Sequence, residues 1–78
     1  MKTFKVLGSG CKKCQTTADM IATKAAEMGV EVVIEKVTDM GAIMGYGVMS
    51  TPGVVVDETV IHTGSVPGNV VIEGWLAP

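Results

Sequence analysis

The sequence contains few aromatic residues, no long apolar run and little net charge. One Trp, one Tyr and one Phe occur in 78 residues, and the formal net charge is −2 at pH 7. Nucleic-acid binding is therefore disfavoured, because it requires several basic residues on one face and aromatic rings for base stacking. No apolar run approaches the roughly 18 residues that span a bilayer, and the first ten residues are too polar for a signal peptide. These absences predict a cytoplasmic protein that binds neither nucleic acid nor membrane.

The composition is that of a small folded protein with an aliphatic core. Hydrophobic residues make up 47% of the chain and charged residues 18%. This apolar content argues against disorder, and a chain of this length holds one core, so residues 1–78 are expected to form a single domain. Methionines at helical spacing are expected to fill gaps in an aromatic-poor core: Met20, Met28, Met40 and Met44.

The first half of the chain predicts a strand, a long helix and a second strand. Residues 3–7 are typical of a strand that stops at Gly8-Ser9-Gly10, whose glycines allow a tight bend. Residues 11–28 are helical, since small and apolar side chains recur three or four positions apart on one face. Gly29 is expected to end this helix, and residues 30–37 alternate as a strand does. The helical stripe consists of Cys14, Ala18, Ile21, Ala25 and Met28.

The second half predicts a short helix, a hairpin and a last helix. Asp39 is a suitable N-cap for the short helix. Strands at 54–56 and 59–63 flank Asp57-Glu58, which reads as a tight turn. The last helix is expected to start near Ser65 and Pro67, to run to about residue 76 and to turn four side chains inward: Val71, Ile72, Trp75 and Leu76. The order β-α-β-α-β-β-α indicates an α/β fold with a four-stranded mixed sheet between helices.

The two cysteines, Cys11 and Cys14, flank two lysines. Cys14 lies on the apolar stripe of the predicted helix, whereas Cys11 precedes the first full turn at a glycine-rich corner. Such a pair suits thiol–disulfide exchange, in which an accessible thiolate attacks and a sheltered thiol resolves the mixed disulfide. The helix start is expected to lower the pKa of the Cys11 thiol, and Lys12 and Lys13 add smaller support for the thiolate.

Other interpretations of this cysteine pair stay open. A CxxC loop between a first strand and a first helix also holds Cu(I) in small metal carriers, although Ser9 stands where those proteins usually have Met. A structural zinc site needs four ligands, and His62 is the only other strong candidate, while a lone His in a hairpin is usually a surface residue. Two inert core thiols, or a binding module that only senses redox state, are further alternatives.

A second motif, Thr51-Pro52, begins the strand before the hairpin turn, where sheets tolerate proline. Together with GSGCKKC (residues 8–14), it resembles the thioredoxin-like superfamily, in which a cis-proline precedes the third core strand and packs beside the active-site cysteines. The chain is most similar to small single-domain redox-active disulfide proteins, which lack the additional N-terminal strand and helix of ordinary thioredoxins. The resemblance covers essentially the whole chain. Tyr46 and Met49, in the preceding loop, are candidates to line a docking groove.

The resemblance implies a thioredoxin-like fold and a protein disulfide oxidoreductase without a cofactor or a metal. Cys11 would be the nucleophile and Cys14 the resolving thiol. Thr51 and a cis Pro52 would bind an extended substrate segment through strand-like pairing. A disulfide-containing protein would be the substrate, and a thioredoxin-reductase-type protein would donate the electrons.

The sequence also departs from the family patterns. Ordinary thioredoxins carry Trp-Cys-Gly-Pro-Cys, whereas Ser9-Gly10 precedes the first cysteine here and Lys12-Lys13 fills the motif. Lys5 stands at the position of thioredoxin's buried strand carboxylate, so no acidic group is expected to deprotonate Cys14. Gly64-Ser65 matches the glutathione clamp of glutaredoxins poorly. The substrate and the redox potential therefore do not follow from the resemblance.

Overall fold

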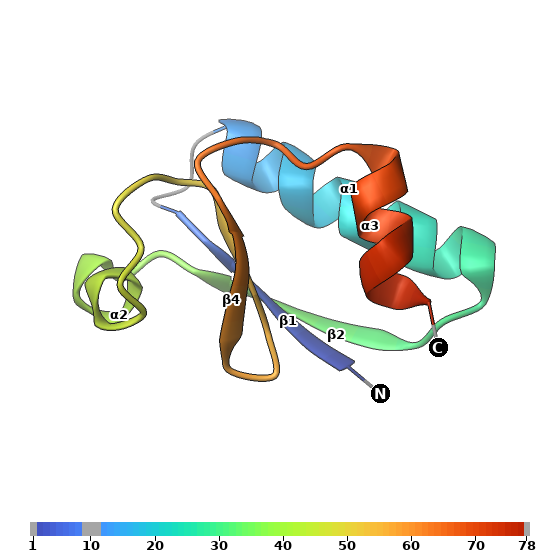
Figure 1. Ribbon diagram of the computed structural model, residues 1–78, viewed down its shortest axis with the longest axis horizontal. Coiled ribbons are helices and arrows are strands. Elements are labelled where there is room, and N and C mark those ends of the chain that lie inside the picture. The colour runs from blue at the N-terminus through green and yellow to red at the C-terminus, as the bar shows by residue number, and fades with distance from the viewer. Residues whose placement is uncertain (1, 9–11, 78) are drawn as a thin grey trace.

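The computed structural model of the protein describes residues 2–8 and 12–77. The predicted β-α-β-α-β-β-α order is confirmed (Figure 1). The elements are β1 (Lys2–Leu7), α1 (Lys12–Met28), β2 (Val32–Val37), α2 (Met40–Gly45), β3 (Gly53–Val56), β4 (Thr59–Thr63) and α3 (Asn69–Leu76). No helix within these described residues is long and apolar enough to cross a membrane.

The four strands form one mixed sheet in the order β2-β1-β3-β4. β1 pairs in parallel with β2, from Lys2 opposite Val32 to Leu7 opposite Val37. β3 runs antiparallel to both β1 and β4. Because β1 is an interior strand, Gly8, which follows its C-terminal end, lies near the middle of that end of the sheet. The four-stranded mixed sheet predicted from the sequence is therefore confirmed.

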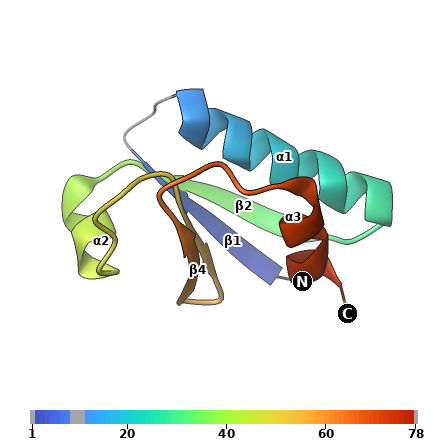
Figure 2. The same ribbon diagram turned by 45° about the horizontal axis from the view of Figure 1, so that its top comes forward.

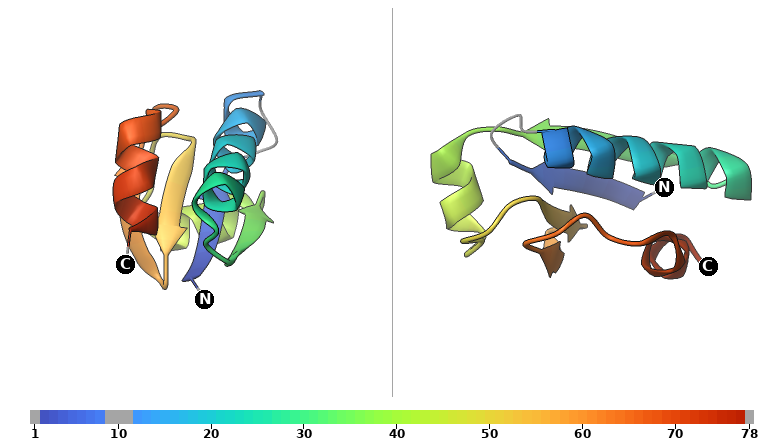
Figure 3. Two further views of the ribbon diagram at one scale, coloured as in Figure 1. Left: turned by 90° about the vertical axis from the view of Figure 1, so that its right-hand side faces the viewer. Right: turned by 90° about the horizontal axis from the view of Figure 1, so that it is seen from above.

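Helices cover the two faces of this sheet unequally. α1 contacts β1, β2 and α3, so α1 and α3 share one face (Figure 3). Phe4 and Val6 of β1 belong to the core on that side. Leu7 points to the other face, because side chains alternate along a strand, and packs there with Ile43 of α2. Figure 2 shows α2 at the opposite end of the sheet from α3.

α1 ends as the sequence predicts, at Gly29. This residue has a φ of 69°, a conformation that glycine adopts without strain. The N–H of Gly29 bonds to the carbonyl of Ala26 at 3.2 Å, and the N–H of Val30 bonds to that of Ala25 at 2.9 Å. These two bonds form a Schellman motif. Val30 therefore belongs to the helix cap, which is why β2 begins at Val32 rather than at residue 30.

The hairpin between β3 and β4 has the predicted two-residue turn. Asp57 and Glu58 both have positive φ angles, 47° and 69°. Asp57 is held by β1, since its N–H donates to the carbonyl of Thr3 at 3.1 Å and its Oδ1 accepts from the N–H of Thr3 at 3.3 Å. These bonds compensate for a backbone conformation that residues with side chains rarely adopt.

α3 starts later than predicted. Its N-cap is Gly68, and no side-chain hydrogen bond caps it. Ser65 cannot serve as the N-cap because its carbonyl and hydroxyl oxygens lie 3.0 and 3.1 Å from Nε2 of His62, which holds the residue in the loop after β4. Pro67 is buried in that loop rather than in the first turn of the helix.

The predicted inward face of α3 is partly correct. Ile72 and Leu76 are buried, and Trp75 is partly buried against the core. Val71 was expected to point inward but is 46% exposed. The later start of α3 leaves an eight-residue helix that packs along one narrow stripe, and Val71 lies outside it.

The expected role of the methionines in the core is wrong for three of the four. Met20 packs against the core, but Met28 is exposed, and Met40 and Met44 are 57% and 70% exposed. Met28 is the last residue of α1. For Met40 and Met44 the reason lies in the length of α2, which has six residues and buries only Ile43. A helix this short presents one side chain to the sheet, so its two methionines face solvent. Asp39 caps α2 as predicted, accepting from the N–H of Ala42 at 2.9 Å.

Candidate active site

The first turn of α1 holds Cys14 inside the molecule. Cys14 is 6% exposed and belongs to the core formed with β1 and α3, as the helical stripe predicts. Lys12 and Lys13, two residues and one residue before it, are exposed. Thr17 is buried one turn later and donates from Oγ1 to the carbonyl of Lys13 at 2.8 Å. Cys11, the expected nucleophile, lies outside the described residues.

Gly8 brings the end of β1 directly against the Cys14 thiol. A Cβ atom on Gly8 would lie 2.0 Å from Sγ of Cys14 and 3.1 Å from its Cβ, so no other residue fits without displacing the cysteine. The N–H of Gly8 donates to the carbonyl of Val37 at 2.9 Å, which fixes this backbone to the end of β2. The sequence suggested that Gly8 permits a tight bend. The structure gives a different reason, since its φ lies outside the left-handed region and the space beside it is filled by sulfur.

Thr51 lies close to Gly8 and to the Cys14 thiol, and Pro52 follows it. The Thr51–Pro52 peptide bond is cis, as the resemblance implied. The same Cβ on Gly8 would also be 3.7 Å from the Cβ of Thr51, so Cys14 and Thr51 both lie against the place where Gly8 has no side chain. Pro52 is buried and Thr51 is exposed. The structure thus brings together two motifs that are far apart in the sequence.

The loop after β4 also contacts Pro52. The N–H of Gly64 donates to the carbonyl of Pro52 at 3.0 Å, and Gly64 has a φ of 88°. A Cβ there would also lie 3.5 Å from the Cβ of Ser50. The sequence reasoning considered Gly64-Ser65 only as a glutathione clamp and missed this contact. The position of Gly64, directly after β4 and three residues before Pro67, is the sequence feature that could have indicated this contact.

His62 supports this same loop and is not placed as a base or a metal ligand. Its Nε2 lies within hydrogen-bonding distance of the Ser65 carbonyl and hydroxyl, and its ring lies 5.8 Å from that of Trp75. Among the residues that the structure describes, no three side chains of His, Cys, Asp or Glu gather into a group that could hold a metal ion. His62 therefore links the loop after β4 to α3.

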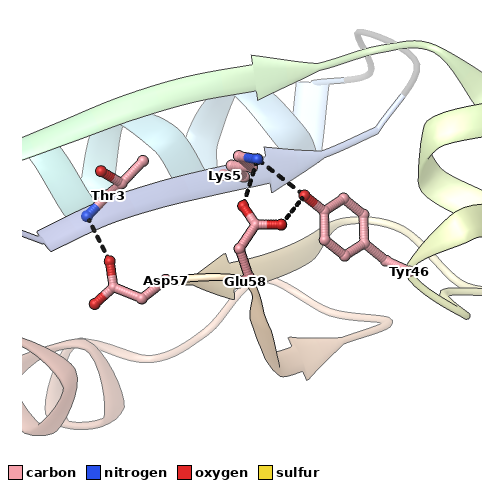
Figure 4. A network of polar contacts seen from close by, with 5 residues as sticks. All are labelled: Thr3, Lys5, Tyr46, Asp57 and Glu58. Carbon is pink, nitrogen blue, oxygen red and sulfur yellow. Dashed lines mark hydrogen bonds and ion pairs between the residues drawn. The ribbon is translucent and has the colours of Figure 1, made fainter.

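Lys5, at the position of thioredoxin's strand carboxylate, forms a polar network on the opposite face of the sheet (Figure 4). Its Nζ donates to Oε1 of Glu58 at 2.7 Å and to Oη of Tyr46 at 2.9 Å. The Tyr46 hydroxyl in turn donates to Oε2 of Glu58 at 3.1 Å. Lys5 alternates along β1 with Phe4 and Val6, so the sheet separates its ammonium group from Cys14.

This network changes the pKa values of both charged groups, Lys5 and Glu58. The hydrogen bond from Lys5 lowers the pKa of the Glu58 carboxyl, and the bond from Tyr46 adds to the effect. The same bonds, to Glu58 first and to Tyr46 second, raise the pKa of Lys5. Tyr46 is therefore engaged away from Thr51, and the expectation that it lines a groove there is not supported. Met49 is 98% exposed in the loop before Thr51.

Fold and site together define a class of protein. A cysteine sheltered in the first turn of α1 lies behind the end of a central strand, next to a cis-proline that leads into an antiparallel hairpin. This arrangement is that of the thioredoxin-like α/β proteins.

Comparison with known proteins agrees with this class. The family model described as "Thioredoxin domain" matches residues 2–77. A thioredoxin from Methanocaldococcus jannaschii is 34% identical over 67 residues, which cover 86% of this chain and 77% of that protein. A thioredoxin from Methanothermobacter thermautotrophicus is 30% identical over 57 residues, or 73% of this chain and 74% of the relative. The chain belongs to the thioredoxin domain family and is a thiol–disulfide oxidoreductase. Neither relative gives support to a metal carrier.

The contact between Gly8 and Cys14 predicts the effect of one added methyl group. Gly8→Ala should displace the Cys14 side chain and lower the free energy of unfolding by about 1–3 kcal/mol, the usual cost of overpacking a core. In a Cys14→Ala background the sulfur is absent, and the same substitution should cost less than about 1 kcal/mol. Urea unfolding of the four proteins in reductant measures this coupling. Equal costs in the two backgrounds would show that the contact does not constrain the site.

The lowered pKa of Glu58 predicts a pH dependence of stability. A carboxyl group with a lowered folded-state pKa contributes stability above its unfolded pKa, about 4.5, and loses that contribution as the pH falls through the folded value. Glu58→Gln should therefore be less stable than the wild type at pH 7 and equal to it in acid below both values. Urea midpoints measured across the acid range give the difference. As the control, Glu58→Gln in a Lys5→Met background should show a much smaller pH-dependent difference, and an unchanged one would refute the pairing.

Proposed function

We propose that Cys11 and Cys14 are the redox-active pair, with Cys11 as the attacking thiolate and Cys14 as the resolving thiol. The observation that carries this proposal is the shelter of Cys14 between the core and Gly8, beside an exposed Thr51. A thiol in that place reacts with its neighbour in the motif more readily than with a bulky substrate. Cys11 immediately precedes the first residue of α1, where orphan N–H groups stabilise a thiolate.

The proposed reaction transfers two electrons by two exchanges. The Cys11 thiolate attacks one sulfur of the substrate disulfide, which forms a mixed disulfide and expels the first substrate thiolate. The Cys14 thiolate then attacks the sulfur of Cys11 and expels the second substrate thiolate. The substrate gains two electrons and, after protonation, two protons, while the protein is left with a Cys11–Cys14 disulfide. A thioredoxin-reductase-type donor must return the two electrons.

Thr51 and Pro52 are proposed to bind the substrate segment around its disulfide. The chain is anchored on both sides of Thr51, since Val48 and Pro52 are buried while the three residues between them are exposed. A segment held in this way can present backbone groups to an extended polypeptide, as in the addition of a strand. We assign Thr51 this role and give Pro52 the task of fixing the loop beside Cys14.

Lys12 and Lys13 are proposed to support the Cys11 thiolate. The first turn of a helix favours carboxylates, yet the first turn of α1 contains no acidic residue and begins with these two lysines. Their charge opposes the helix dipole, so helix stability does not account for them. A nearby thiolate does, because positive charge favours the ionised form of a thiol.

The Cys→Ser variants test the two roles. Cys11→Ser should lower the rate of disulfide reduction at least about 100-fold, because the attacking sulfur is gone. Cys14→Ser should still attack and should accumulate a mixed disulfide with the substrate, since no resolving thiol is present. Mass spectrometry after reaction with a disulfide peptide distinguishes the two, and the wild type serves as the control. If Cys11→Ser reduces the peptide as fast as the wild type, the assignment fails.

The working direction is proposed to be reduction of partner disulfides in the cytoplasm, where thiols are kept reduced. The reduction potential of the Cys11–Cys14 pair, measured by equilibration with glutathione or dithiothreitol, should lie near the −270 mV of reducing thioredoxins. A value near about −120 mV would instead identify an oxidant and would refute this direction.

A further inference from the structure

Charged side chains are distributed unequally along the molecule. Lys12 and Lys13 lie in the first turn of α1, at the end of the sheet that holds Cys14. Four of the eight acidic side chains lie toward the opposite end: Glu27 in the last turn of α1, Glu31 before β2, and Asp57 and Glu58 in the β3–β4 turn. Figure 1 shows α1 crossing the sheet from the first of these ends to the other. The net charge of −2 therefore does not describe the field at the active site.

A third lysine, Lys36, is brought to the same end by the fold. Parallel pairing places it opposite Val6, near the end of β1. Its Nζ donates to Oε1 of Gln15, the residue that follows Cys14, and Nε2 of Gln15 donates to Oδ1 of Asp19 at 2.9 Å. Asp19 thus orients Gln15 so that its oxygen faces the ammonium group. Lys36 is exposed and is held beside the first turn of α1.

These three lysines differ from Lys5 and Lys24 in their partners, whereas Lys2, which donates to the carbonyl of Trp75, lies at the start of β1. Lys5 and Lys24 form ion pairs with carboxylates at 2.7 to 3.8 Å. Over residues 2–8 and 12–77, no ion pair involves Lys12, Lys13 or Lys36. Two carboxylates lie nearer to this end, Asp19, which accepts from Gln15, and Asp39, which accepts from the N–H of Ala42. Both donors are neutral, so these carboxylates keep their charge and leave three ammonium groups against two carboxylates.

The acidic end is too distant to cancel this charge. α1 has 17 residues, and at a rise of about 1.5 Å per residue its two ends are about 24 Å apart. The Debye length at physiological ionic strength is about 8 Å, so water and salt screen the carboxylates at the far end. The three ammonium groups therefore act together on a molecule that approaches the active site.

We propose that Lys12, Lys13 and Lys36 form a basic docking surface that selects partner proteins whose disulfide lies in an acidic segment. This inference rests on the proposed function and adds the chemistry of the substrate. Charge complementarity of this kind mainly accelerates encounter and rejects partners of like charge. Lys36 is far from the cysteine motif in the sequence, so the motif alone does not indicate that Lys36 belongs to this surface.

Two synthetic peptides with the same disulfide loop, one flanked by glutamates and one by lysines, provide the test. The reduced wild-type protein should reduce the glutamate peptide several-fold faster at low salt, and the difference should shrink at about 0.5 M salt. Lys36→Gln should lower the rate with the glutamate peptide about two- to fivefold and raise the rate with the lysine peptide. Lys24→Gln, which removes the same charge from the far half of α1, should leave the ratio of the two rates unchanged.

The opposite effects of Lys36→Gln on the two peptides separate docking from a loss of structure, which would slow both reactions. Equal rates with both peptides, or a ratio that Lys36→Gln does not change, would overturn the basic docking surface and leave the redox function intact. No reduction of either peptide by the wild-type protein would overturn the proposed function, and this inference with it.

Discussion

The contact between Gly8 and the Cys14 thiol is the constraint on which the site depends. β1 ends there, and its last residues are tied to β2 through the bond from Gly8 to Val37. Because Gly8 has no side chain, the sulfur of Cys14 can lie against the backbone, with Thr51 close to the same point. A central strand, the first turn of a helix and a cis-proline loop are thereby fixed against one another. The Cys14 thiol is therefore positioned by packing against the backbone.

The two faces of the sheet perform different tasks. The face under α1 and α3 is apolar and encloses Cys14. The other face carries Lys5, whose bonds to Glu58 and Tyr46 join the central strand to the β3–β4 turn and to the end of α2. Lys5 replaces the carboxylate of ordinary thioredoxins and faces away from the thiol. This strand position therefore presents no carboxylate to Cys14, and the polar network serves to hold the short α2 in place.

Much of the fold could be predicted because local signals and tertiary packing agree. The stripe through Cys14 and Ala18 defines α1, and the positive φ of Gly29 ends it. Thr51-Pro52 was recognised as half of the site only through a family resemblance. The start of α3 and the reason for Gly8 could not be predicted, since they depend on contacts between distant segments, from His62 to Ser65 and from Gly8 to Cys14. Spacing along the chain does not report such contacts.

The loop before Pro52 shows how a small domain can expose a binding segment without losing order. Val48 is 4% exposed and packs with Ile43 and Leu7, and Pro52 is buried and bonded to Gly64. The chain between these two anchors has only three residues, too few to collapse onto the surface. Met49 and Thr51 consequently remain in solvent, and Thr51 lies close to Gly8 and the Cys14 thiol. A polypeptide that docked there, as proposed, would meet a preformed edge, so the entropy of ordering this loop would be lost on folding rather than on binding.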